Sequence, residues 1–187
     1  MFNENLIHKN RILGRILEEI PEFTYLGDQI LRTPTEEVSI EEGKMIGKKL
    51  GEVLVKYRQI AGFGRGLAAP QIGIGKSVFV TFLDNKLEIY INPEIVDVSE
   101  GLNFFRELCL SSTFIEADVR RHEWVVLRWF DENGVEHKEK FDGLKARLIQ
   151  HEFKHLLGIP NVDEAEPGSL RIAGDPLQEK LRSSRLE

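Results

Sequence analysis

The sequence predicts an α+β fold in which antiparallel sheets pack around a central helix. Short apolar and β-branched runs follow one another between residues 77 and 141, separated by turn sequences and not by helices. Helical periodicity appears before and after this region, without the strand and helix alternation of parallel sheets. The length of 187 residues is enough for one domain with a sizeable core. We therefore expect a single domain over residues 1–187, made of a variable lead-in (1–20), a core (21–164) and a C-terminal tail with a short helix (165–187).

Composition excludes several function classes. The formal net charge is −6, from 31 acidic and 25 basic residues, which argues against a general nucleic-acid or anionic-membrane binder. No stretch of about 18 apolar residues occurs, and the N-terminus lacks an apolar core of signal-peptide length. The single cysteine, Cys109, cannot form an internal disulfide. We expect a cytoplasmic protein that binds neither DNA nor membranes.

The first third of the chain predicts one long helix. Residues 1–20 are expected to be mobile or weakly helical, and residues 26–38 extended. Ser39 and Glu42 then form a capping box that opens a helix running to about Tyr57. Glycines spaced by four weaken this helix but leave a flat groove, which predicts close packing against a neighbour. These glycines are Gly43, Gly47 and Gly51.

The apolar runs in the middle of the chain predict a series of strands. They are rich in valine, isoleucine and aromatic residues, and short polar turn sequences separate them. The expected strands are residues 77–83, 87–92, 94–99, 124–130 and 135–141, and the expected hairpin turns are residues 84–86 and 131–134.

The last predicted helix carries ionisable groups on a buried face. Asp142 is a good N-cap and Gly158 a good left-handed stop, so residues 143–157 should form one helix of about four turns. Residues 150–158 within this region read QHEFKHLLG. Helical geometry places both histidines and the glutamate on a face shared with leucines, and leaves a narrow polar stripe that we expect to face solvent. The stripe consists of Arg147, Gln150 and Lys154.

The H-E-x-x-H pattern gives the inward groups a common role. Histidines at i and i+4 stack one turn apart and can bind one divalent metal, while the glutamate lies close enough to a water on that metal to act as its base. The alternative is a helix whose buried groups are satisfied by neighbouring polar atoms. The full pattern on an inward face favours a metal site at His151 and His155 with Glu152 beside it.

A catalytic metal site of this kind needs a third protein ligand. The metzincin pattern does not supply it, because Asn161 stands where the last histidine belongs and no methionine follows the motif. Glu164 or Glu166 would complete a thermolysin-like set, although their segment reads better as a solvated loop. Cys109, within ELCLS (107–111), is the remaining candidate, but a cysteine in an apolar stretch is by itself more often a small buried residue.

Three motifs occur in a fixed order along the chain: GRGLAAPQ (64–71), ELCLS (107–111) and QHEFKHLLG (150–158). As a set they resemble the peptide deformylases, which remove the formyl group from the initiating methionine of newly made bacterial and organellar proteins. The segments LGDQILRTPTEEV, IYINPEI and RWFDENG are also similar to that family, so the resemblance runs from about residue 26 to about residue 164.

The resemblance implies an H-E-x-x-H helix that lies against antiparallel sheets and holds one divalent transition metal. Its ligands would be Cys109, His151 and His155, with a water in the fourth position. A thiolate and two imidazoles suit Fe(II), Zn, Ni or Co, and Fe(II) is the metal expected in the cell. Glu152 would act as general base toward the water and as acid toward the departing amine.

The resemblance also assigns the groups around the substrate. Gln71, through its side-chain amide, and Leu110, through its backbone N–H, would stabilise negative charge on the formyl oxygen. Gly66 would lie close to the peptide backbone. The implied partners are N-formylmethionyl nascent peptides and, transiently, the ribosome. The tail residues that could touch ribosomal RNA are Lys180, Arg182 and Arg185.

Three residues on the substrate side depart from the family pattern. Arg65 stands in place of an apolar residue, Leu108 in place of a glycine, and Glu116 where an arginine is common. We expect all three to affect substrate binding and hypothesise that Arg65 pairs with Glu116 across the groove. Leu108 would strain the backbone if its φ were positive. Lys154, where an aspartate is frequent, should matter little.

The predicted function is a metal-dependent hydrolase that removes the N-formyl group from N-formylmethionyl peptides and releases formate. The altered groove leaves two alternatives open. One is a similar hydrolase with a different N-acyl substrate, and the other is a catalytically silent homologue that binds peptide N-termini or the ribosome. Glu152 and Gln71 are both present, which favours an enzyme because a purely structural metal needs neither.

Overall fold

The computed structural model describes residues 2–173 and combines helices with antiparallel sheets, so the predicted α+β class is confirmed. The helices are α1 (Phe2–Glu19), α2 (Ile40–Ala61) and α3 (Gly143–Leu156), with 3₁₀ turns η1 (Gln29–Arg32), η2 (Ala69–Ile72), η3 (Leu110–Ser112) and η4 (Asn161–Glu164). The strands are β1 (Gly66–Ala68), β2 (Val78–Leu83), β3 (Lys86–Val98), β4 (Leu102–Leu108), β5 (Ile115–His122), β6 (Trp124–Phe130), β7 (Glu136–Asp142) and β8 (Arg171–Ile172).

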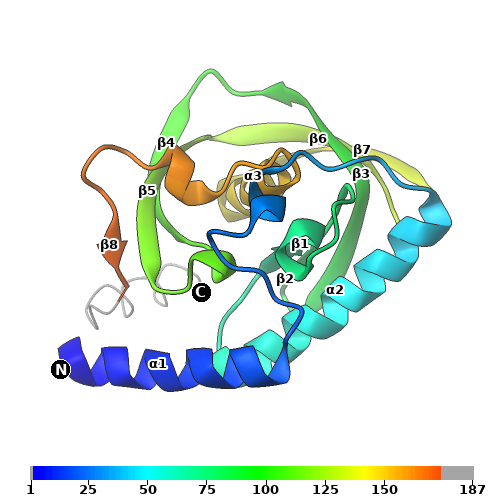
Figure 1. Cartoon of the computed structure of the whole chain (residues 1–187). Helices are drawn as coiled ribbons and strands as arrows, with labels where there is room; N and C mark the ends of the chain where they lie inside the picture. The colour runs from blue at the N-terminus through cyan, green and yellow to red at the C-terminus, as the bar shows by residue number, and fades with distance from the viewer. Residues whose placement is uncertain (1, 174–187) are drawn as a thin grey trace.

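The described strands form two antiparallel sheets. The larger has the order β1-β2-β3-β6-β7 and the smaller the order β4-β5-β8. Figure 1 shows α3 near the centre of the molecule, while α1 and α2 lie along its outside. Because α3 packs against β1, β2, β6 and β7 of the larger sheet and β5 of the smaller, the H-E-x-x-H helix lies between the two sheets.

Helices cover both faces of the larger sheet at β2, with α2 on one face and α3 on the other, which explains why β2 is apolar almost throughout. Val80 and its register partner Ile89 belong to the core on the α2 side, whereas Phe79 and its partner Tyr90 belong to the core on the α3 side. Successive strand residues point to opposite faces, so a strand buried on both faces reads as a continuous apolar run. The α3 side of this core includes Ala146, Ile149 and Leu156.

The glycines of α2 form the groove in which β3 packs. A Cβ atom added at any of the three would come within about 2.5 Å of a side-chain carbon of β3. Four residues along a helix and two along a strand both advance by about 6–7 Å, so three glycines match three successive side chains on one face of the strand. The predicted close packing is confirmed. The pairs are Gly43 with Ile91, Gly47 with Ile89, and Gly51 with Leu87.

We expect Gly47→Ala to lower the free energy of unfolding by a net amount of about 1 kcal/mol. Overpacking typically costs about 1–3 kcal/mol, and it opposes a gain in helix propensity of about 1 kcal/mol. Gly14→Ala in α1 is the matched control, because nothing lies within 4 Å of its added Cβ and only propensity acts. Urea unfolding of both variants measures the difference, and a stabilised Gly47→Ala would contradict the packing argument.

Two boundaries differ from the predicted ones. α2 continues past Tyr57 to Ala61 and ends at Gly62, whose φ of 79° makes it a left-handed cap. Residues 87–92 and 94–99 form one strand, β3, and not two, since register shifts after Ile91 and Ile95 absorb the interruption.

The smaller sheet was not predicted from the sequence. β4 and β5 carry many charged residues, so their segments do not read as buried strands. In the structure these charges pair across the two strands, Arg106 with Asp118 at 2.8 Å and Arg121 with Glu107 at 2.9 Å. The pairs satisfy the charges within the sheet, and the sequence alone does not show them.

The N-terminal segment forms a regular helix, where the sequence suggested a mobile or weakly helical lead-in. α1 spans Phe2–Glu19, and Ile16 and Ile20 at its end are buried in the core. Residues 26–38 contain the 3₁₀ turn η1, capped by the Asp28 side chain, and are not simply extended as predicted.

The C-terminal tail is described only as far as residue 173. Within this part, β8 pairs with the beginning of β5. The predicted short helix at 176–186 lies outside the described residues, as do the basic side chains of Lys180, Arg182 and Arg185. None of the helices in residues 2–173 has the length and apolar character needed to cross a membrane.

Candidate active site

α3 directs the H-E-x-x-H residues into the interior, as predicted. The helix begins at Gly143 after the extended residue Asp142, and Gly158 with a φ of 71° stops it. Glu152 and His155 are buried, and the side chain of His151 is only 11% exposed. Groups of this kind need partners inside the protein.

Two of the three residues of the polar stripe of α3 face the protein and not the solvent, so the prediction was wrong for Arg147 and Gln150, whereas the Lys154 side chain is 33% exposed. Arg147 and Gln150 are buried. The Gln150 side chain donates to the His122 carbonyl at 2.9 Å and accepts from the His122 N–H at 3.0 Å, which ties the helix to β5. Leu144 and Leu157, which lie outside this stripe, are 40% and 42% exposed. The unpredicted smaller sheet supplies the partners that bury the polar side.

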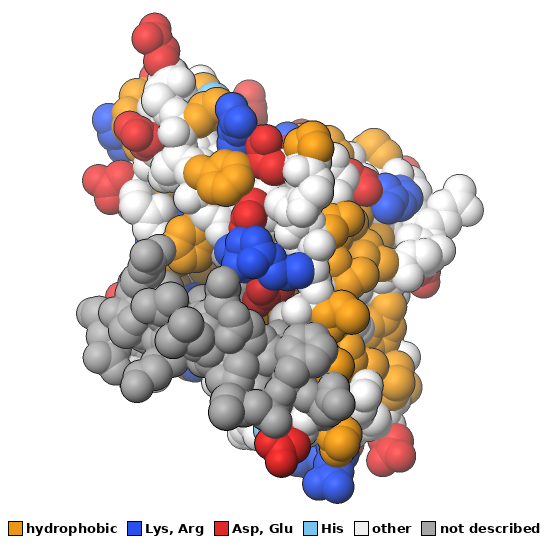
Figure 2. Space-filling model, turned by 90° about the vertical axis from the view of Figure 1, so that its left-hand side faces the viewer, with side chains coloured by type: hydrophobic (Ala, Val, Ile, Leu, Met, Phe, Trp, Pro, Cys, Tyr) orange, Lys and Arg blue, Asp and Glu red, His pale blue; other side chains and the backbone are white. Residues whose placement is uncertain are grey.

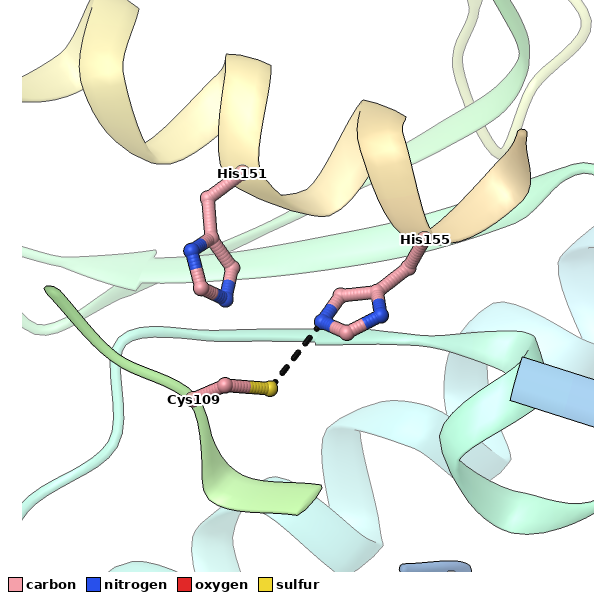
Figure 3. A group of neighbouring side chains, drawn as sticks. All are labelled: Cys109, His151 and His155. Carbon is pink, nitrogen blue, oxygen red and sulfur yellow. Dashed lines mark hydrogen bonds between the residues drawn. The ribbon is translucent and has the colours of Figure 1, made fainter. Parts of the chain in front are cut away.

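Cys109, His151 and His155 converge on one point (Figure 3). Their ligand atoms all lie within 4.8 Å of one another, and Cys109 Sγ is 3.1 Å from His155 Nε2. The imidazoles come from successive turns of α3, and the thiol approaches from the opposite side, where β4 passes into η3. The two other candidates for a third ligand, Glu164 and Glu166, form salt bridges elsewhere.

This donor set fits a divalent transition metal. A thiolate with two imidazoles is a ligand set for Fe(II), Zn, Ni or Co, with bonds of about 2.0–2.3 Å for zinc. Burial alone would raise the pKa of the Cys109 thiol, but the charge of His155 and the hydrogen bonds from both histidines lower it well below its ordinary value. This shift favours the thiolate, which is the form of cysteine that binds a metal.

Glu107 fixes the orientation of His151. Its carboxylate accepts a hydrogen bond from His151 Nδ1 at 2.9 Å, so Nε2 is the ring nitrogen that remains available to bind a metal. The same carboxylate accepts bonds from Arg121 at 2.9 and 3.0 Å and from Arg147 at 2.6 Å. Burial would raise the pKa of Glu107, but the bond from His151 and the charges of His151 and Arg121 lower it. A buried anion thus holds the imidazole in place.

Glu107, Arg121 and Arg147 were not predicted as part of the site. Glu107 stands two positions before Cys109, and residues two apart on an extended chain share a face, so this spacing was the available signal. The arginines have no comparable signal, because their contacts with Glu107 depend on how β4, β5 and α3 pack together.

Glu152 lies against β1. It is 3% exposed, and nothing in residues 2–173 hydrogen-bonds to its Oε2 atom. Burial raises the pKa of Glu152 to about 7, against the lowering effect of the two histidines. An added Cβ at Gly66 would lie 2.6 Å from the Glu152 carboxyl carbon, so this glycine makes the space for the carboxylate. A buried carboxyl with a pKa near neutrality is suited to proton transfer.

Gln71 directs its amide toward the sulfur of Cys109. The side chain is 1% exposed, and its Oε1 accepts a bond from the Ala68 N–H at 2.8 Å, which fixes the amide. Its Nε2 donates to Ser111 Oγ at 3.1 Å and lies 3.6 Å from Cys109 Sγ. Leu110 begins η3 directly after the cysteine, and the first N–H groups of such a turn have no partner within it. Two N–H donors therefore lie next to the cluster.

A cavity of about 500 Å³ opens onto these groups. Leu108 contributes to its wall, and its φ is not positive, so the expected backbone strain is absent. The predicted site residues that line the cavity are Gly66, Arg65, Gln71, Leu108, Leu110, His151 and Glu152.

Glu116 occupies a different position from the other predicted substrate residues. It lies opposite Leu108 in the β4–β5 register, is 4% exposed, and is not among the described residues that line the cavity. Its pairing with Arg65 stays a prediction.

The site combines a cysteine, two histidines, a buried carboxylate and two N–H donors at the edge of a cavity. This combination defines a metal-dependent hydrolase of the H-E-x-x-H class. The family model of polypeptide deformylase matches residues 20–170. The chain belongs to the peptide deformylase family.

Known relatives agree with this assignment. A peptide deformylase from Pseudothermotoga lettingae is 39% identical over 79% of this chain and 84% of its own length, and one from Prochlorococcus marinus is 43% identical over 74% and 70%. The crystal structure of a Synechococcus elongatus peptide deformylase with actinonin superposes with a TM-score of 0.69 at 34% identity, covering 88% of this chain and 84% of that one. The Thermotoga maritima enzyme gives a TM-score of 0.70 at 31% identity, covering 78% and 97%.

Family membership confirms the main functional prediction. Peptide deformylases are metal-dependent hydrolases that remove N-formyl groups from nascent peptides, and the chain carries the Cys109, His151 and His155 cluster that such chemistry requires.

Proposed function

We propose that this protein deformylates N-formylmethionyl nascent peptides with Cys109, His151 and His155 as ligands of one divalent metal and Glu152 as general base and acid. The observation that carries the proposal is the convergence of three ligand atoms within 4.8 Å, beside a carboxylate that is 3% exposed. A catalytically silent homologue would need neither Glu152 nor Gln71, whereas both are present here and line the cavity.

A metal bound by this cluster would polarise the formyl carbonyl and acidify a water molecule. We propose Fe(II) as the metal in the cell, with Zn, Ni or Co compatible with the same ligands. Glu107 would keep His151 in the tautomer that presents Nε2 to the ion, because its carboxylate already accepts the Nδ1 proton.

Glu152 would move the proton during hydrolysis. Its Oε2 has no partner within residues 2–173, so it can accept a proton from a water nucleophile. The raised pKa of about 7 lets the resulting acid return that proton to the departing amine near neutral pH. Burial also keeps bulk water away from this transfer.

Gln71 and Leu110 would stabilise the charge that develops on the formyl oxygen. The Gln71 amide is fixed before the substrate arrives, because its oxygen is bonded to the Ala68 N–H. The Leu110 N–H lies at the start of η3. Donors fixed in advance are each typically worth about 2.7–4 kcal/mol in the transition state.

The peptide would lie between two sheet edges. β1 is the outer strand of the larger sheet and β4 the outer strand of the smaller, and residues of both line the cavity. Edge strands offer backbone groups with which an extended peptide can pair. We assign peptide contact to Gly66 and Arg65 on one side and to Leu108 on the other, with Glu116 acting through Arg65.

We further propose that the protein works in the cytoplasm and meets the ribosome only transiently. Figure 2 shows acidic and basic side chains interleaved on one face, beside a band of hydrophobic ones, and not a field of one sign. Such a surface, with a net charge of −6, favours short-lived contact over stable binding to RNA.

Formate release from N-formylmethionyl-alanyl-serine tests the proposed function. Protein purified without oxygen and loaded with Fe(II) or Ni(II) should release formate, a chelator should abolish this activity, and the same metal should restore it. The N-acetylmethionyl peptide is the control and should remain intact. Acetate release without formate would indicate a different N-acyl substrate, and no release from folded, metallated protein would indicate a binding role.

A further inference from the structure

The segment between α1 and η1 is bonded to both turns that carry the N–H donors of the site. The N–H of Thr24 donates to the carbonyl of Gln71 at 2.9 Å, and the N–H of Leu26 donates to the carbonyl of Ser111 at 3.0 Å. Gln71 belongs to η2 and Ser111 to η3. Residues 24–26, which we call the strap, therefore join two turns that lie far apart in the sequence.

The side chain of Thr24 adds a third bond to this connection. Its hydroxyl donates to the carbonyl of Pro70 at 2.8 Å, so Thr24 binds two successive carbonyls of η2. Hydrogen bonds are directional, and two of them from one residue resist rotation of the turn better than one does. Phe23, directly before the strap, is 5% exposed and packs in the core. The strap is thus anchored at its beginning.

A side-chain bond links the two turns to each other. Nε2 of Gln71 donates to Oγ of Ser111 at 3.1 Å, and both residues are 1% exposed. The strap, η2 and η3 are therefore each bonded to the other two. An amide nitrogen carries two hydrogens, so the bond to Ser111 leaves one hydrogen of Gln71 for the formyl oxygen. A shift of either turn would change the direction of that hydrogen.

We propose that Thr24 is a positioning residue for deformylation, because the strap holds η2 and η3 in the arrangement that directs the Gln71 amide and the Leu110 N–H toward the formyl oxygen. The inference rests on the proposed function. Thr24 is not among the described residues that line the cavity, so it would act through the two turns. Donors fixed in advance stabilise the transition state more than the bound substrate. A weakened strap should therefore lower kcat and leave KM nearly unchanged.

Thr24→Val tests this inference, because valine keeps the branched shape and removes only the hydroxyl bond to Pro70. Thr33→Val is the matched control, since the Thr33 hydroxyl also donates to a carbonyl of a 3₁₀ turn, that of Gln29 in η1, at 2.9 Å. Thr24→Ser keeps the hydroxyl without the methyl group. The substrate is N-formylmethionyl-alanyl-serine, and all proteins carry the same metal.

We expect kcat of Thr24→Val to be about tenfold below that of the wild type, less than the hundredfold loss that a displacement of about 1 Å can cause. KM should stay within about twofold of the wild-type value, because the donors act mainly in the transition state. Thr24→Ser and Thr33→Val should both keep kcat close to that of the wild type.

Hydrogen–deuterium exchange of the metal-loaded proteins provides a readout that does not depend on turnover. Thr24→Val removes a bond to η2 only. We nevertheless expect faster exchange in the segments that contain η2 and η3, because the strap connects them. Thr33→Val should leave exchange in both segments unchanged.

Several outcomes would overturn the inference: a wild-type kcat in Thr24→Val, a change in KM alone, or faster exchange confined to η2. An equal loss of kcat in Thr33→Val or in Thr24→Ser would also overturn it, since the hydroxyl bond to η2 would then not be the cause. Wild-type protein that releases no formate would count against the proposed function, whereas the exchange comparison would still test the connection between the two turns.

Discussion

Glu152→Gln should reduce the rate of formate release by a factor of about 10²–10⁴, the usual contribution of a positioned general acid and base. Glutamine keeps the size and shape of the side chain but can neither accept nor return the proton. Because Glu152 does not belong to the cluster of ligand atoms, the metal content should equal that of the wild type. The expected result is a folded, metallated and nearly inactive protein.

Three measurements together test this expectation: kcat for formate release, metal content by atomic absorption, and the thermal unfolding temperature. Glu166→Gln is the control, because this carboxylate pairs with Arg120 and lies outside the cluster of ligand atoms. Full activity of Glu152→Gln would assign proton transfer to another group. Loss of metal together with activity would make Glu152 a support of the metal site.

The parts of the fold that the sequence predicted correctly are those determined by nearby residues. α2 begins after the Ser39 cap as expected, because the Ser39 hydroxyl accepts a bond from the Glu42 N–H only three residues away. The hairpin between β2 and β3 is equally local, since Asp84 and Asn85 both adopt positive φ in a two-residue turn. Helix caps and tight turns can therefore be predicted without knowing which distant residues they contact.

The burial of the polar stripe of α3 could not be predicted from neighbouring residues alone. Helical periodicity correctly directs Glu152 and His155 inward, but it also assigned Arg147 and Gln150 to solvent. Their partners are Glu107 on β4 and the backbone of His122 on β5, so only the packing of the smaller sheet reveals that the stripe is buried. Sequence periodicity predicts that a long polar side chain is exposed whenever the partner that buries it is unknown.

The choice among candidates for a third metal ligand illustrates the same limit within the site. Residue chemistry alone left Cys109, Glu164 and Glu166 as candidates, because Cys109 belongs to a segment distant in sequence from the helix and only the fold brings it to the histidines. The family resemblance favoured the cysteine, and the structure brings its sulfur within 3.1 Å of His155. Glu107, whose carboxylate supports His151, lies within the ELCLS motif, but its role was not predicted because it depends on two buried arginines.

Gly66→Ala should lower kcat/KM by a factor of about 100, the loss that a displacement of about 1 Å can cause in a reacting group. An added Cβ would lie 2.6 Å from the Glu152 carboxyl carbon and 2.8 Å from its Cγ, whereas ordinary contacts are 3.4–4 Å. β1 cannot easily move away, because Gly66 is paired with Thr81 of β2. The carboxylate must therefore leave its position.

Gly75→Ala is the matched control for this effect, because nothing lies within 4 Å of its added Cβ. Neither glycine has a positive φ, so alanine fits the backbone at both positions and the two variants differ only in what the methyl group touches. kcat/KM, metal content and thermal unfolding should show an inactive, metallated Gly66→Ala and an unchanged Gly75→Ala. Normal activity of Gly66→Ala would mean that Glu152 can transfer the proton from a second position, and the space beside β1 would then serve only the peptide.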